Sequence, residues 1–448
     1  MPRILPWIAC LTMGMAGVRS QEGDELRHAL ERLGRGALED GALGLTLAVD
    51  QGGAIVFAGG WGMAAGHDAQ AGPDTPFVSG PLLGNFLAVA ALRLAERGEF
   101  DLAAPLAKLV PGLYADRPEI TIDRLLTHTS GIPSYGELLA AERRQAAAFA
   151  PAPILAWLKT APLDSEPGSC ASYSNTDDFL LGLALEQASG KRLAELLEAE
   201  VFGPAGMEDT RWRADPSERH ASAHLDQEFG GGVTVLGDAP PPFDADDLHS
   251  TALDLVRFQR ALLGEKLLKS ASRELRQEAA ALADGSRAAH ARGVSLTALG
   301  DLPRQSAGGG MAGQRVHVAY YPTLDTTIAV LASGAEAPSE SLERAAARLV
   351  FGLETAEVRD LPLPAAERTL HVGEYYAACT SYVITEANEH LVLVMPGGER
   401  HELLYQGEGR FLARKHRDLQ VAFELDDGHA LALILTERGV SLRAVRVA

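Results

Sequence analysis

Apolar and polar residues recur along the first hundred residues with two different periods. Gln21–Asp40 is polar except for one apolar face, which predicts an amphipathic helix. The short apolar runs Leu43–Val49 and Ala54–Ala58, separated by a Gln-Gly-Gly turn, predict a β-hairpin. A broad apolar face over Phe77–Arg97 predicts a second helix, which Gly98 would end.

Further helices and strands are predicted up to residue 353. Ser250 and Thr251 precede an apolar run and supply oxygen acceptors suited to a helix N-terminus. Residues 219–246 are rich in Gly, Pro and Asp, which is typical of loops. The expected helices are Pro151–Lys159, Asp178–Ala188, Ala252–Leu263 and Ser339–Leu349, and the expected strand is Ile328–Ala332.

The pattern changes after residue 353. Glu354–Ala366 is polar with two prolines, which predicts a linker. From His371 onward apolar and polar residues alternate, which predicts antiparallel strands in a small barrel or sandwich. The expected strands are Tyr382–Thr385, His390–Met395, His401–Tyr405, Leu419–Leu425, His429–Leu435 and Val440–Val447.

Composition and charge limit the classes of partner. The chain has 448 residues, of which 46% are hydrophobic and 22% charged, so it can form both a packed core and a hydrated surface. Its formal net charge at pH 7 is −20. An acidic surface repels phosphate backbones, which argues against nucleic acid as a partner.

The N-terminus has the pattern of an export signal. Arg3 is followed by the apolar run Ile4–Val18 and then by small residues before Gln21. This run is too short to predict a transmembrane helix, and a buried N-terminal strand or helix is the alternative interpretation. We expect residues 1–20 to be a signal peptide and the mature chain to be periplasmic or extracellular.

The cysteines and acidic residues predict neither a metal site nor a cofactor. Without the signal peptide, Cys170 and Cys379 remain, and a bridge between them is allowed in an exported protein but not implied. No CxxC spacing indicates structural zinc. The segment containing Asp244, Asp246, Asp247 and His249 has no second ligand cluster beside it, so a solvated acidic loop is expected.

The region before the second helix resembles the nucleophile region of a hydrolase family. Thr75-Pro76-Phe77 is followed, after three residues, by the place where that family has Ser-x-x-Lys. The family is the serine β-lactamase and penicillin-binding-protein-like hydrolases, in the branch with class C β-lactamases, D-aminopeptidases and esterases. Pro81 holds the place of the serine and Gly84 that of the lysine. Proline is tolerated in a first helical turn, so the change is compatible with the fold.

A second stretch, Ile120–Ile132, matches the family's Ile-Thr-x-x-x-Leu-Leu-x-His-Thr-Ser-Gly sequence. Two interpretations are open for its polar residues. Either His128 and Ser130 form a catalytic pair, or the loop hydrogen-bonds its own backbone and packs behind the site. We favour the second interpretation.

Two further motifs are present in altered form. Tyr173 and Asn175 match the family's Tyr-x-Asn motif, in which the tyrosine relays protons and the asparagine holds a substrate amide. Residues 305–327 resemble the third motif, Lys-Thr-Gly or His-x-Gly on a strand. Its cationic position holds Ala307, or Ser306 if the register differs by one residue. Neither residue can bind a substrate carboxylate, although the glycine pattern is kept by Gly309, Gly310 and Gly313.

The resemblance implies an α/β (α+β) fold with a β-lactamase-like antiparallel sheet, flanking helices and a helical subdomain. It also implies a lipocalin-like C-terminal barrel. We expect residues 21–353 to form the first domain, 354–366 the linker and 367–448 the barrel. No catalytic set is intact, because the corresponding positions hold Pro81, Gly84, Tyr173, Asn175, Ala307 and Gly309.

The altered positions predict a pseudoenzyme, because acyl transfer in this family needs a hydroxyl and an amine three residues apart on one helix face. It would bind a peptide, a cell-wall fragment or a protein partner through Tyr173, Asn175, Gly309 and Gly310. The alternative is an active hydrolase that uses Tyr173, Ser79, Cys170 or His128. A third hypothesis gives the binding function to the barrel.

Overall fold

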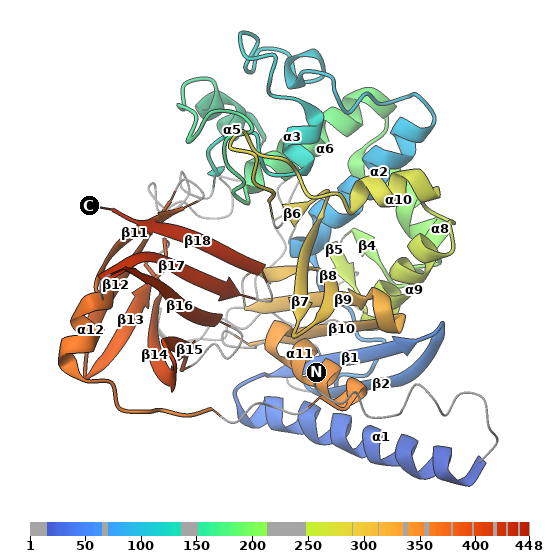
Figure 1. Cartoon of the computed structure of the whole chain (residues 1–448). Coiled ribbons are helices and arrows are strands. Elements are labelled where there is room, and N and C mark those ends of the chain that lie inside the picture. Colours follow the sequence, from blue (N-terminus) through green and yellow to red (C-terminus); the bar gives the residue numbers. More distant parts are fainter. Residues whose placement is uncertain are drawn as a thin grey trace, which may run out of the picture.

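A mixed sheet-and-helix domain and an all-β barrel make up the protein (Figure 1). The barrel lies on one side of the sheet, and its strand β18 contacts strand β7 of the sheet. The computed structural model describes residues 16–64, 70–135, 151–212, 248–288, 290–311, 313–334, 339–353, 358–377, 380–396, 398–414, 419–426, 429–437 and 440–447.

The central sheet is antiparallel and has the strand order β2-β1-β10-β9-β8-β7-β6. The predicted hairpin forms its first two strands, and β1 pairs with β10 over its full length, from Gly44 opposite Ser333 to Gln51 opposite Thr326. The two ends of the domain therefore meet in the middle of one sheet. The strands are β1 (Gly44–Gln51), β2 (Ala54–Gly62), β6 (His290–Ala291), β7 (Val294–Leu299), β8 (Leu302–Met311), β9 (Gln314–Tyr321) and β10 (Thr326–Ser333).

Helices α1 (Ala16–Glu39) and α11 (Ser339–Phe351) pack together on one face of the sheet. The expected leucine face of α1 is seen at Leu30, which is fully buried in the cluster beneath the sheet. A buried ion pair ties α11 to the sheet. It joins Arg304 on β8 to Glu343 on α11, and both side chains are fully buried.

The opposite face carries the helix around which the other helices pack. Helix α2 (Leu83–Glu96) buries almost all of its residues, and Phe86 makes edge-to-face contacts with Phe202 and Phe258. The surrounding elements are η3 (Gly80–Leu82), η4 (Leu106–Lys108), α3 (Ile122–Leu126), α5 (Pro151–Leu158), α6 (Asn175–Ser189), α7 (Leu193–Leu197), η6 (Glu198–Phe202), α8 (Gly203–Ala205), α9 (Ala252–Leu263), α10 (Ser270–Arg276) and η9 (Pro322–Leu324), with a small sheet of β3 (Phe77–Val78), β4 (Arg211–Trp212) and β5 (Leu248–Ser250).

The predicted boundaries of two helices were wrong. The helix expected from Phe77 begins only at Leu83, because Phe77 pairs with Ser250 in β3 and a 3₁₀ turn follows. Helix α6 begins three residues earlier than expected, because the Ser174 hydroxyl accepts a hydrogen bond from the Thr176 N–H and caps it.

The C-terminal part is a closed eight-stranded barrel, which decides between the two expected architectures. Alternation along the chain missed two of its strands, and one of them has only four residues. The sequence also did not predict helix α12 (Ala365–His371). The strands are β11 (Gly373–Ala377), β12 (Thr380–Ala387), β13 (His390–Val394), β14 (Arg400–Gly407), β15 (Arg410–Ala413), β16 (Leu419–Asp426), β17 (His429–Glu437) and β18 (Val440–Arg446).

The second half of the expected linker is bound to the barrel. The Leu361 N–H donates to the Tyr405 carbonyl at 2.9 Å, and the Gln406 side chain bonds both backbone groups of Arg359. Residues 359–363 therefore run along β14. In the described ranges, no helix has both the length and the apolar character needed to cross a membrane.

Candidate functional site

The site predicted from the motifs lies where η3 leads into α2. Strand β8 packs against η3, which brings the third motif beside the position of Pro81. Ser79, just before η3, is fully buried, and its hydroxyl donates to the Phe77 carbonyl at 2.9 Å. The Ser79 N–H is also bonded, to the Leu248 carbonyl. Its hydroxyl is thus held by its own strand.

Gly84, on the first turn of α2, is in contact with α6. A Cβ atom at Gly84 would lie 2.7 Å from Oδ1 and 3.0 Å from Oδ2 of Asp178. Real Cβ atoms do not come this close to an oxygen, so a side chain here would displace the Asp178 carboxylate. A longer side chain at position 84 would enter the space beside α2. The Asp178 carboxylate, which comes from α6, occupies that space.

Tyr173 and Asn175 lie beside this carboxylate. The Tyr173 hydroxyl donates to Asn175 Oδ1 at 2.9 Å and lies 3.4 Å from Asp178 Oδ2. Desolvation of the hydroxyl and the nearby Asp178 charge raise the pKa of Tyr173 well above its usual range. The residue is 59% exposed, so a neutral phenol beside a carboxylate faces solvent here.

The pKa of the Asp178 carboxyl is itself raised. Burial raises its pKa to about 6; the neighbouring Asp177 charge also raises it, while the His128 charge opposes the shift. The side chain remains partly exposed. Near neutral pH this carboxyl is mostly ionised, and it gains protons as the solution becomes mildly acidic.

His128 and Ser130 lie buried behind Tyr173, and both bind the carboxylate of Asp177. Ser130 Oγ donates to Asp177 Oδ1 at 2.6 Å, and His128 Nδ1 lies 3.3 Å from Asp177 Oδ2. Burial alone would lower the pKa of His128, but the hydrogen bond to Asp177 and the charge of Asp178 raise it. These contacts fix the loop after α3 to the start of α6.

Two residues without any motif complete this polar cluster. Arg276 on α10 donates to Asn85 Oδ1 at 2.6 Å, and burial lowers its pKa to about 10. The His290 ring lies 4.8 Å from that of His128, and burial together with the charges of His128 and Arg276 lowers its pKa to about 3. The sequence offered no signal for either residue, because neither falls in a recognisable motif.

Strand β8 presents the third motif without a cation on the site face. Ala307 pairs with Val318 and packs against the core that contains α2. Gly308 and Gly310 point to the other face, since a Cβ at Gly310 would meet the Arg315 side chain. Gly309 and Gly310 are exposed.

The remaining candidate residues are not brought together. Cys170 is disulfide-bonded, so it does not supply the free thiol that the alternative hypothesis of an active hydrolase considered. Asp244, Asp246 and Asp247 lie outside the described residues, and His249 lies in β5, opposite Arg211. The described ranges contain no group of three His, Cys, Asp or Glu side chains suited to hold a metal ion.

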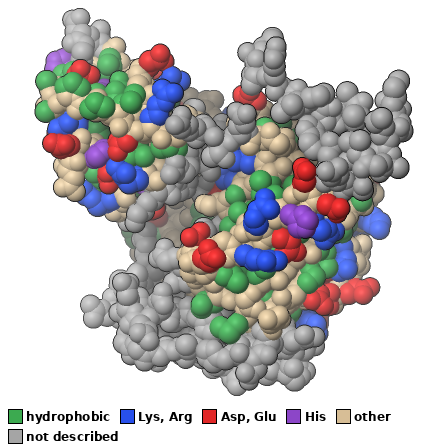
Figure 2. Space-filling view, turned by 90° about the horizontal axis from the view of Figure 1, so that it is seen from below, with side chains coloured by type: hydrophobic (Ala, Val, Ile, Leu, Met, Phe, Trp, Pro, Cys, Tyr) green, Lys and Arg blue, Asp and Glu red, His purple; other side chains and the backbone are tan. Residues whose placement is uncertain are grey.

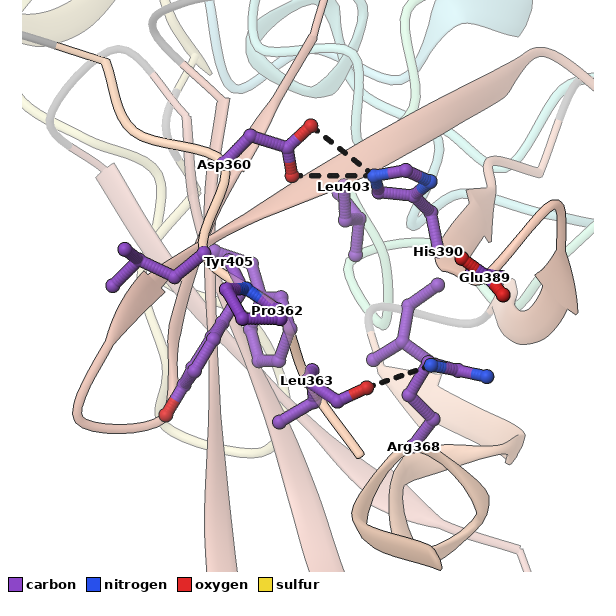
Figure 3. Close-up of a pocket in the computed structure, with 11 residues that line it drawn as sticks. Asp360, Pro362, Leu363, Arg368, Glu389, His390, Leu403 and Tyr405 are labelled. Carbon is purple, nitrogen blue, oxygen red and sulfur yellow. Dashed lines mark hydrogen bonds and ion pairs between the residues drawn. The ribbon is translucent and has the colours of Figure 1, made fainter. Parts of the chain in front are cut away.

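A separate pocket lies where the linker crosses the end of the barrel (Figure 3). It encloses about 610 Å³ of empty space, part of which is open to solvent. Its inner wall is apolar and its rim carries charges of both signs, two of which, Asp360 and His390, are paired across it. The inner wall includes Leu391, Leu403 and Phe411, and the rim includes Asp360, Arg368, Glu389 and His390.

One face of the molecule carries charges of both signs. Acidic and basic side chains of the described residues are interspersed on the face seen in Figure 2.

Comparison with known proteins places the chain in a family. The Beta-lactamase family model matches residues 25–352. Penicillin-binding protein 4* of Bacillus subtilis (strain 168) is 26% identical over 389 residues, covering 81% of this chain and 85% of that protein. Esterase EstB of Burkholderia gladioli is 35% identical over 167 residues, covering 34% and 42%.

Solved structures show the same fold over nearly the whole chain. The octameric penicillin-binding protein homologue from Pyrococcus abyssi superposes with a TM-score of 0.65 at 18% identity, covering 94% of this chain and 99% of that one. At this identity the likeness concerns the fold alone. Because the family model spans most of the chain and the expected sheet, helices and barrel are all present, the protein belongs to the Beta-lactamase family.

Proposed function

We propose that this chain is a non-catalytic member of its family that binds a peptide, a cell-wall fragment or a protein partner at the η3 site. By this name we mean Pro81, Gly84, Tyr173, Asn175, Asp178 and Ala307. The observation that carries the proposal is the start of α2, where Asp178 fills the side-chain space of Gly84.

The chemistry of acyl transfer explains why this observation matters. The family's nucleophile needs a hydroxyl, and its base needs an amine one turn later on the same helix face. Pro81 has no hydroxyl and Gly84 has no side chain. Tyr173 does not replace the base, because its raised pKa keeps the phenol protonated.

The other candidate nucleophiles are engaged elsewhere. The Ser79 and Ser130 hydroxyls are buried and donate to Phe77 and Asp177. Cys170 is disulfide-bonded, and His128 is buried against Asp177. An active hydrolase built from these residues therefore has no supporting observation.

A direct test is turnover combined with covalent labelling. We expect the purified protein to hydrolyse a chromogenic β-lactam and an activated ester no faster than an equal concentration of serum albumin does. Intact-mass measurement after incubation with a penicillin should show no adduct. A stoichiometric adduct at one residue, or turnover that a Pro81→Ala change alters, would contradict the proposal.

The binding residues and the cellular location are part of the same proposal. Tyr173 and Asn175, with the exposed backbone of Gly309 and Gly310, would contact the ligand. Export follows from the N-terminal signal pattern and would give the site access to cell-wall material. Sequencing the N-terminus of protein recovered from the producing cells tests this, because an uncleaved Met1 would contradict it.

A further inference from the structure

We infer that the η3 site selects a positively charged ligand group, an ammonium or a guanidinium, and disfavours ligands that end in a carboxylate. The inference rests on the proposed non-catalytic binding function and adds the class of ligand. It follows from a change in the sign of charge at the site.

The first step concerns the cations that the motif positions lack. The family resemblance assigns a lysine to position 84 and a lysine or histidine to position 307. This chain has Gly84 and Ala307 there, so neither position carries a cation for a ligand carboxylate. Arg315 does not substitute for them, because its side chain lies over Gly310 on the opposite face of β8.

The second step concerns the anion that lies at this position. Asp178 lies against Gly84, and the position is thus anionic where the motif would have an amine. Asp178 is half-buried as a residue, and among the described residues Tyr173 donates a hydrogen bond to its carboxylate. Asp177 differs, because His128 and Ser130 already engage both of its oxygens.

The third step concerns the aromatic ring beside the carboxylate. Tyr173 is 59% exposed, the largest exposure among the exposed large hydrophobic side chains described. An exposed phenol ring next to a carboxylate offers a cation both an ion pair and a cation–π contact. An anion would meet the carboxylate, and the residues that the structure describes place no compensating cation on the site face.

The charged groups around Asp178 do not reverse this preference. His128 and Asp177 lie behind Tyr173 as a buried, mutually engaged pair, and His290 is held neutral by burial. Arg276 is buried and donates to Asn85 on the α10 side of α2. Within the described part of the chain, Asp178 and Tyr173 are therefore the groups offered to a ligand at this site.

Three matched dipeptides test the inference on the full-length protein. D-alanyl-D-alanine amide is a cation, N-acetyl-D-alanyl-D-alanine is an anion, and the N-acetyl amide is neutral. Titration calorimetry at pH 7 and low salt, where the α-amino group is mostly protonated and Asp178 mostly ionised, should show that the cation binds roughly tenfold or more tightly than the neutral peptide, as expected for one charge-assisted contact. The anion should bind more weakly than both.

Two variants assign the effect to one residue. Asp178→Asn keeps the size and the acceptor for Tyr173 and should abolish the preference for the cation. Asp24→Asn, an equal change of charge at an exposed residue of α1 across the sheet, should leave it intact. Equal or tighter binding of the anion, or a cation preference that survives in Asp178→Asn, would overturn the inference.

The outcomes separate this inference from the proposed function. If none of the three peptides binds and no turnover is seen, the ligand class is wrong while the absence of catalysis stands. If the peptides are hydrolysed, the proposed function fails, and the ratio of their binding constants still decides the charge preference.

Discussion

At the scale of single residues, the contact between Gly84 and Asp178 is the feature on which the site depends. The two residues lie on different helices, α2 and α6, and each limits the other. Gly84 allows the carboxylate to approach, and the carboxylate leaves no room for another residue at 84. The missing side chain at position 84 and the position of the Asp178 carboxylate are therefore linked.

We expect Gly84→Ala to destabilise the protein by about 1 kcal/mol or less, because the new methyl group overlaps Asp178, whose flexible side chain can shift. Gly36→Ala on α1 is the control, since nothing lies within 4 Å of its added Cβ and alanine favours a helix. Urea unfolding measures both. In an Asp178→Gly background the cost of Gly84→Ala should largely disappear, and an undiminished cost would show that the overlap is with another group.

The raised pKa of Asp178 predicts that the stability of the protein depends on pH. Its folded pKa of about 6 lies above the ordinary value, so the fold favours the protonated form. The stabilisation is present at low pH and is lost as pH rises from about 4 through about 6.

Asp178→Asn should therefore stabilise the protein by about 1–3 kcal/mol at pH 7.5, with a gain that shrinks toward pH 4.5. Urea midpoints of the two proteins across this range measure it. A difference that stays constant with pH would mean that burial does not perturb this carboxyl.

At the scale of elements, strand β8 is held in place by a buried ion pair. Arg304 binds Glu343 of α11 through Nε and Nη2, and Nη2 also contacts the His317 ring. Because β8 carries Ala307 and packs against η3, this network on the far face of the sheet fixes the strand that borders the site.

We expect Glu343→Gln to cost about 3 kcal/mol, since the buried Arg304 guanidinium then keeps only Glu340, at 3.3 Å, as a counter-charge. Glu424→Gln, which removes an exposed ion pair with Arg443 on the barrel, should change stability little. Thermal unfolding compares the two. Similar losses of stability in both variants would show that the buried ion pair contributes no more than the exposed one.

At the scale of the whole molecule, the barrel and the sheet domain are joined by more than a flexible tether. Residues 359–363 are bonded to β14, and His390 on the barrel pairs with Asp360 of the same segment. Strand β18 contacts β7 at the sheet. Part of the expected linker is thus held against the barrel by backbone and side-chain hydrogen bonds.

The disulfide of Cys170 leads to a prediction about domain attachment. If residues 1–20 are removed, Cys379 is the only other cysteine, so we predict that the bridge joins the sheet domain to the barrel. Mass spectrometry of an unreduced digest should find one peptide pair containing both residues. Limited proteolysis should separate the domains faster after reduction, and a Cys170 peptide linked to a second chain would contradict this pairing.

The local pattern of residues was sufficient to predict much of the architecture. Helix α9 has the predicted bounds, and the hairpin of β1 and β2 is where alternation and a Gln-Gly-Gly turn placed it. These predictions succeed because helical and strand periods are properties of neighbouring residues. The start of α2 was misplaced because a partner from residue 250 draws Phe77 into a strand.

The sequence alone determined that position 81 has no hydroxyl, that position 84 has no amine, and that the chain resembles its family. Only the tertiary structure decided which group lies beside position 84, where the family has its amine. Asp178 lies 94 positions from Gly84 along the chain, and no periodic pattern indicates that their helices bring them into contact. The closure of the barrel and the engagement of Ser79 were likewise decided by packing, because they depend on contacts between residues that are distant in sequence.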